Sequence, residues 1–171
     1  GKNIDVPGEE CKQVLDKQVA RGVAYAYAHH FAPDGAREAL TAYRESFRAS
    51  RWLAAPRALA AVSVVCGADD AEAEDLVTSS ALFFLRAGQG LRDLPLPTVT
   101  EAKAYPYDAD ERTLLAHHRR SVIVGGRERV GATLAQLAND IAVDELMITT
   151  MIESHEERRR SYERTASLFD A

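Results

Sequence analysis

The hydrophobic residues of this chain follow two spacings, one typical of strands and one typical of helices. Residues 23–31 (VAYAYAHHF) carry β-branched and aromatic side chains at alternate positions, which predicts a strand. Residues 59–66 (LAAVSVVC) form a continuous apolar run, typical of a strand covered on both faces in a parallel sheet. Residues 143–152 (VDELMITTMI) predict a further strand.

Between these runs, apolar residues recur every three or four positions, which predicts helices. The first helix is expected to run to about Ala49 and the last to about Phe169. Helix starts are expected at Asp34, at Asp69 or Asp70, at Gly125–Gly126 and at Ser154. In the last helix, Ser154 and Glu157 fit a capping box. The inward residues there are expected to be Tyr162, Thr165, Ala166 and Phe169.

Residues 88–107 interrupt this alternation because glycine and proline punctuate them. A short polar helix is expected over 108–120, followed by an apolar stretch at 122–124. Long excursions of this kind in compact domains are lids, binding loops or disordered segments. The region 86–120 is therefore interpreted as a lid, with a surface loop of no function as the alternative.

The order of the predicted elements favours right-handed βαβ units and a parallel sheet. Two architectures fit, an open doubly wound sheet and part of a (β/α)8 barrel. Gly125-Gly126-Arg127 lacks the GxGxxG spacing of a dinucleotide-binding loop. The sequence therefore gives little support for a dinucleotide-binding site.

Composition narrows the class of protein. The 171 residues include 46% hydrophobic and 27% charged residues, ordinary for one globular domain. The net charge of −5 and the lack of a basic patch argue against nucleic-acid binding. No apolar run is long enough to span a membrane, and the first residues lack a signal-peptide core. Cys11 and Cys66 are expected to be free thiols, so a cytoplasmic protein is predicted.

Several ordered motifs resemble the luciferase-like, flavin-dependent monooxygenase family. The segment 124–130 (VGGRERV), the apolar positions of the helix after it, and Asp144–Ile148 (DELMI) resemble the closing unit of that family's barrel. Residues 25–33 (YAYAHHFAP), with Tyr43-Arg44 and Phe47-Arg48, resemble a mid-barrel strand and its helix. Tyr105-Pro106-Tyr107 and Ser161-Tyr162-Glu163 also match in order and spacing.

The resemblance implies an α/β fold, a parallel (β/α) barrel of TIM type, of which this chain supplies the C-terminal half. Residues 21–171 are assigned to that half-barrel, and residues 1–20 match the family poorly. A complete barrel takes about 250 residues. The implied activity is oxygenation of a small organic substrate by reduced FMN and O2, with the FMN reduced by a flavin reductase. A deazaflavin is the alternative cofactor, and a non-catalytic flavin-binding or assembly module is the alternative function.

Active sites of such barrels lie at the carboxyl ends of the strands. His29 and His30 are accordingly predicted as catalytic residues, either as hydrogen-bond donors near the flavin or as a proton relay, and a capping role is the alternative. Strand alternation would place only one of them inside the barrel. The other strand ends predicted at this rim are Cys66-Gly67 and 149–151. His117-His118 is expected on a solvated helix face, and no histidine–carboxylate spacing suggests a metal site.

A half-barrel exposes strand edges and one apolar strand face, which favour aggregation unless they are paired. The sequence therefore predicts a homo-oligomer, or association with an N-terminal half-barrel. The other expected partners are O2 and a small-molecule substrate of undetermined class.

Overall fold

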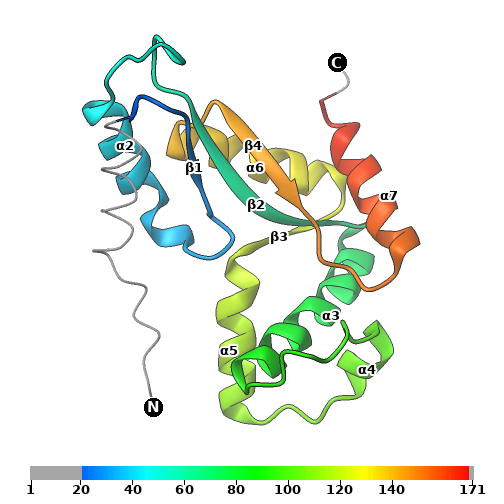
Figure 1. Ribbon diagram of the computed structural model, residues 1–171. Helices are drawn as coiled ribbons and strands as arrows, with labels where there is room; N and C mark the ends of the chain where they lie inside the picture. The colour runs from blue at the N-terminus through cyan, green and yellow to red at the C-terminus, as the bar shows by residue number, and fades with distance from the viewer. Residues whose placement is uncertain (1–20, 170–171) are drawn as a thin grey trace.

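The computed structural model describes residues 21–169, in which strands and helices alternate (Figure 1). The strands are β1 (Tyr25–Tyr27), β2 (Ala58–Cys66), β3 (Val122–Gly125) and β4 (Glu145–Thr149). The helices are a short 3-10 turn η1 (Pro33–Gly35), α2 (Ala36–Ser46), α3 (Asp70–Gly88), α4 (Val99–Ala104), α5 (Ala109–Arg120), α6 (Arg127–Ile141) and α7 (His155–Ala166). The expectations for residues 1–20 lie outside the described residues. None of the helices described here combines the length and hydropathy needed to cross a bilayer.

The four strands of the described residues are all parallel, and β2 is the centre of the sheet. Ser63 of β2 has partners in both β3 and β4, and Leu59 has partners in both β1 and β4. Strands β1 and β3 therefore share one edge of β2, while β4 occupies the other. Strand β3 is thus an addition beside the carboxyl end of β2, and β1, β2 and β4 form the continuous part of the sheet.

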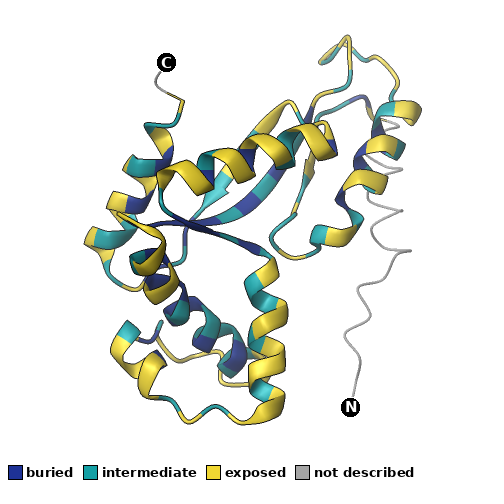
Figure 2. Ribbon diagram, turned by 180° about the vertical axis from the view of Figure 1, so that it is seen from behind, coloured by how far each residue is buried: buried dark blue, intermediate teal, exposed yellow. Residues whose placement is uncertain are grey.

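One face of the sheet is covered by helices. Side chains of β2 at even positions, from Ala58 to Cys66, are fully buried on this face. Leu40 and Tyr43 of α2 pack against its first part, and Val130 and Leu134 of α6 pack against its second part. Helix α6 accordingly lies behind the sheet in Figure 1 and in front of it in Figure 2.

Over the first part of β2, and over β1 and β4 beside it, the opposite face is uncovered in the part of the chain that the structure describes. Its side chains come from alternate strand positions that are exposed or half-buried: Ala26, Leu59, Ala61, Ser63, Glu145, Met147 and Thr149. We call this set the open face. The expectation that residues 59–66 are covered on both faces is wrong for Leu59, Ala61 and Ser63, because the described helices pack on the other face there. It holds at the carboxyl end of the run, where Val65 is buried against Ala73, Leu76 and Val77 of α3.

Several predicted boundaries differ from the structure. The first strand ends at Tyr27, so His29–Phe31 lie in a turn and not at a strand end. Asp34 lies inside η1 and caps no helix, and Gly35 precedes α2 without a side-chain cap. The cap at Asp69 is confirmed, since its side chain accepts the Glu72 amide hydrogen.

The last helix packs through a stripe that agrees with the predicted one at Thr165 only. Ser161 and Thr165 are buried, whereas Tyr162, Ala166 and Phe169 are exposed. Ser154 caps the helix as predicted, by accepting the Glu157 amide hydrogen at 3.3 Å. The Glu157 carboxylate pairs with Arg160 instead of reaching back to the cap.

The segment predicted as a lid is largely helical. Thr98 and Asp108 each start a helix with a complete capping box, which explains why α4 and α5 form within a polar, proline-rich stretch. Ion pairs from Lys103 to Asp75 and from Arg119 to Glu74, each 2.6 Å, attach both helices to α3. Helices α3, α4 and α5 therefore form one unit beside the carboxyl end of the sheet (Figure 1).

Asp144 connects the start of β4 to two other elements. Its carboxylate accepts the Ala58 amide hydrogen at 2.7 Å and contacts the Arg44 guanidinium at 3.0 Å. The same guanidinium donates to the Ala142 carbonyl at 2.6 Å. Asp144 thus sets the register between β2 and β4 and ties α2 to both.

We expect Asp144→Ala to lower the free energy of unfolding by about 1–3 kcal/mol, because the Ala58 amide loses a charged acceptor. Asp144→Asn retains an acceptor oxygen and should lose less. Urea denaturation of the two variants tests this order. Equal losses would mean that the hydrogen bond to Ala58 contributes nothing.

Candidate functional site

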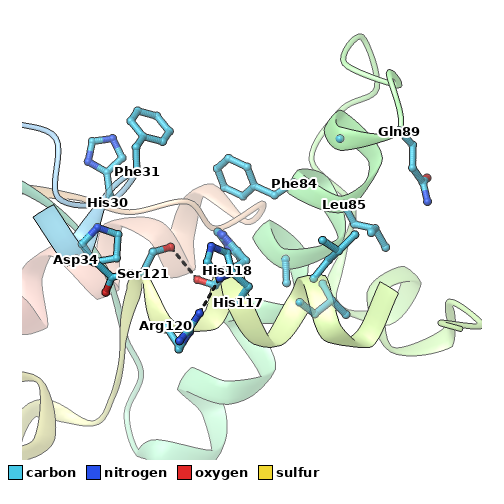
Figure 3. Close-up of a pocket in the computed structure, with 15 residues that line it drawn as sticks. His30, Phe31, Asp34, Phe84, Leu85, Gln89, His117, His118, Arg120 and Ser121 are labelled. Atoms are coloured by element: carbon cyan, nitrogen blue, oxygen red, sulfur yellow. Dashed lines mark hydrogen bonds between the residues drawn. The ribbon is translucent and has the colours of Figure 1, made fainter. Parts of the chain in front are cut away.

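A pocket of about 510 Å³ lies between the turn after β1 and the helices α3 and α5 (Figure 3). We call it the α3–α5 pocket. Its lining residues are His30, Phe31, Pro33, Asp34, Ala81, Phe84, Leu85, Gly88, Gln89, Leu114, Leu115, His117, His118, Arg120 and Ser121. Its volume is within the range of small-molecule sites, about 300–1,000 Å³.

His30 is held in this wall by the neighbouring strand. Its amide donates to the Ala61 carbonyl at 3.1 Å, and its Nδ1 lies 3.0 Å from the same oxygen. A carbonyl oxygen only accepts hydrogen bonds, so this contact places the ring proton on Nδ1. In the neutral ring, Nε2 is then left as an acceptor.

His29 has a different environment, although it was predicted together with His30. It is half-buried in the turn, where its amide donates to the Tyr27 carbonyl, and it is not among the residues that line the α3–α5 pocket. Burial and the neighbouring His30 lower its pKa, while Asp34 opposes the shift. The structure therefore brings His30 to a pocket and leaves His29 beside it.

His118 faces His30 from the other wall of the pocket (Figure 3). Its ring lies against Phe84, with centroids 4.4 Å apart, and its Nε2 is buried without a hydrogen-bond partner among the described residues. The expectation that His117-His118 lies on a solvated face is therefore wrong for His118. It holds for His117, which is exposed and contacts Arg120.

The pKa of His118 is lowered by burial, and also by the neighbouring His117 and Arg119. Because its folded-state pKa lies below the unfolded value of about 6.5, the unfolded chain takes up the proton first as pH falls. We expect the free energy of unfolding to decrease as pH falls below about 6.5, and His118→Asn to reduce this decrease. Urea denaturation of the wild type and the variant between pH 8 and pH 5.5 measures the decrease in the free energy of unfolding. The difference in this free energy between the two proteins at pH 8 serves as the baseline. Parallel pH profiles would show that His118 does not cause the decrease.

The other predicted rim residues lie in a packed polar junction. Cys66 is fully buried, burial raises the pKa of its thiol, and its amide donates to Ser161 Oγ at 2.9 Å. Thr150 donates from its hydroxyl to the Val64 carbonyl and from its amide to the Tyr162 hydroxyl. These groups attach α7 to the ends of β2 and β4 and do not line the α3–α5 pocket. Within residues 21–169, no three His, Cys, Asp or Glu side chains gather as a metal site would require.

Comparisons with known proteins identify the fold. No protein-family model matches the chain. The crystal structure of apo-MsnO8 matches 92% of this chain with a TM-score of 0.81 and 32% identity, over 48% of its own length. YceB, an uncharacterized protein of Bacillus subtilis, is 36% identical over 87% of this chain, and the "Luciferase-like monooxygenase" of Escherichia coli K12 is 27% identical over 83%. The chain belongs to the luciferase-like monooxygenase family.

This luciferase-like chain spans about half the length of the relatives it matches, 45% of YceB and 42% of the Escherichia coli protein. The fold-class prediction is confirmed, since the parallel sheet with its helices is part of a (β/α) barrel. The division at residue 20 and the lid role of 86–120 stay predictions.

The luciferase-like motifs prove to be structural. Asp144 and Arg44 join α2, β2 and β4, as described above. Ser161 accepts the Cys66 amide hydrogen. Tyr105 packs against α3 and donates its hydroxyl to Glu111. The motif residues therefore hold the helices and strands together, whereas the α3–α5 pocket is lined mainly by residues outside the motifs.

Sequence reasoning missed Phe84, His118 and Leu114 as parts of one site. Phe84 is one of the apolar residues that recur at helical spacing between the predicted strands, and His118 carries no signal apart from its pairing with His117. Only the packing of α5 along α3 brings them together. A polar helix that follows a proline-rich excursion gives little indication of which face it buries.

Proposed function

We propose that this chain is the C-terminal half of a flavin-dependent monooxygenase that oxygenates a small organic substrate with reduced FMN and O2. The open face carries the proposal. A sheet with helices on one side and apolar side chains exposed on the other suits a barrel wall whose interior lacks its remaining strands. The family membership and the half-length match to the relatives support the same conclusion.

The proposed occupant of the open face is the N-terminal half-barrel of the longer protein. Met147 is 50% exposed there and pairs in register with Ala61, so both would point into the interior of a completed barrel. The match covers 48% of MsnO8, which leaves the chain length of a second half. A homo-oligomer formed through the open face is the competing outcome.

The residues present fit a flavin only in part. The aromatic side chains of the α3–α5 pocket suit a flat ring. Of the described residues that line it, Arg120 alone carries a fixed positive charge, and it is bonded to His117. A phosphate cradle is therefore expected from the other half of the barrel. A bound flavin would supply the oxygen chemistry, and the protein would supply orientation and a dry pocket.

For this chain's own site residues, we propose that His30 contacts the substrate and that His29 positions the turn. His30 lines the α3–α5 pocket with its Nε2 available as an acceptor, and the Ala61 carbonyl holds its ring in place. This assignment narrows the predicted pair of catalytic residues to one.

The test uses a completed barrel, made by co-expressing this chain with the part of MsnO8 outside the matched region. We would supply reduced FMN from a flavin reductase, 18O2, and a panel of aldehydes, alkanes, sulfonates and phenols. Incorporation of one 18O atom into a panel member is the expected result. Bound FMN without incorporation would favour a non-catalytic flavin-binding module, and a folded complex that binds no FMN would favour an assembly module.

A further inference from the structure

The described residues that line the α3–α5 pocket all lie within residues 30–121, so this chain alone carries the side chains on which the following proposal rests. His30 and Phe31 lie on one side, and Phe84 and His118 lie opposite them (Figure 3). We propose that this pocket binds a planar fused-ring aromatic molecule that carries a hydroxyl group. Its role as the substrate of the monooxygenase rests on the function proposed above.

Aromatic rings on both sides favour a flat ligand. The rings of Phe84 and His118 have centroids 4.4 Å apart, and those of His30 and Phe31 have centroids 4.1 Å apart. Aromatic groups prefer such offset and tilted contacts with further rings. Phe31 is 70% exposed and Leu114 is 60% exposed, so the pocket presents apolar surface that a ligand would cover.

The fixed tautomer of His30 selects the polar group of the ligand. Because Nδ1 is directed at the Ala61 carbonyl, the neutral ring offers an acceptor at Nε2. A hydroxyl group can donate to this nitrogen. An aldehyde, a ketone or a sulfonate has only acceptor atoms, so it would gain no hydrogen bond there.

The charges of the lining favour a neutral ligand. Asp34 and Arg120 contribute one negative and one positive side chain, and the Arg120 guanidinium is bonded to His117. Burial lowers the pKa of His118, which keeps that ring neutral against Phe84 near neutral pH. A strongly anionic ligand would therefore find little compensating charge in this pocket.

The test titrates the 171-residue chain, without flavin, with 2-naphthol and with naphthalene, which lacks the hydroxyl group. Naphthol fluorescence and calorimetry report binding. We expect 2-naphthol to bind more tightly than naphthalene by about three- to tenfold, the effect of one hydrogen bond. Decanal, an aliphatic aldehyde, should bind more weakly than either.

Two variants locate the binding. His30→Asn keeps an amide donor near the Nδ1 position but removes Nε2 and the ring. Loss of the ring should weaken both ligands, and loss of Nε2 should remove the advantage of 2-naphthol over naphthalene. Phe84→Ala should weaken both ligands by about tenfold. Phe169→Ala is the matched control, since Phe169 is 65% exposed and does not line the α3–α5 pocket. Circular dichroism confirms that each variant is folded.

The proposal is overturned if 2-naphthol does not bind, if naphthalene binds equally well, or if His30→Asn leaves the difference intact. Retention of naphthol binding by His30→Gln, which places an amide group near Nε2, would exclude a general loss of structure as the cause. Flavin plays no part in these titrations. A failure here is therefore distinct from a failure of the completed barrel to bind FMN or to oxygenate the panel.

Discussion

Leu134→Ala is expected to lower the free energy of unfolding by about 2–5 kcal/mol, the range for removing a fully buried leucine side chain. Leu134 is 1% exposed and packs with Val62, Val64 and Val130 at the centre of the interface between α6 and β2. Truncation leaves a cavity that the rigid strand cannot close. Chemical denaturation followed by circular dichroism measures the loss.

Leu114→Ala is the matched control, because the same side chain is removed from a site that is 60% exposed. Its effect on unfolding should stay within about 0.5 kcal/mol. If both variants lose the same stability, the packing of α6 against β2 is not the main core of the described fold.

Met147→Arg is expected to cost little free energy in the isolated chain and much more in the completed barrel. In the chain alone Met147 is half-exposed on the open face, so an arginine there remains in water and costs little. In a completed barrel the same position would face the packed interior, where an unpaired charge costs several kcal/mol. We expect association with the complementing half to be lost, as measured by native mass spectrometry.

Met147→Leu provides the comparison for this position, since it keeps an apolar side chain of similar volume. The leucine variant should associate as the wild type does. Association of the arginine variant with undiminished affinity would place the partner elsewhere than on the open face.

The sequence predicted the repeating elements well where pattern and packing agree. The alternating residues before His29 and the apolar run at 59–66 both form strands of one parallel sheet. The stripe Val130, Leu134 and Ile141 is buried as its helical spacing indicated. In these segments the same residues provide the local preference and the buried surface.

Prediction from the sequence was less accurate where tertiary contacts determine the end of a strand or the buried side of a helix. The first strand ends early because the chain turns after Ala28, whose carbonyl accepts the amide hydrogens of Phe31 and Ala32. The last helix buries Ser161 instead of Tyr162, since Ser161 accepts a hydrogen bond from the buried end of β2. Hydrophobicity alone gives no reason to place a serine inward.

The candidate site was predictable only at His30. Its opposite wall depends on how α5 lies along α3, and the ion pair that joins these helices links Arg119 to Glu74, 45 positions apart in sequence. No local pattern encodes that arrangement. The existence of an open face was predictable, because a half-barrel must expose one side of its sheet. Which residues form the open face was not predictable, because that depends on the strand register.

The most direct test of the half-barrel account is an FMN titration of the completed barrel and of this chain alone, followed by quenching of flavin fluorescence. We predict that the completed barrel binds one FMN per complex, and that the chain alone binds far more weakly because it lacks the phosphate cradle. A folded, stoichiometric complex that leaves flavin fluorescence unchanged would contradict the account.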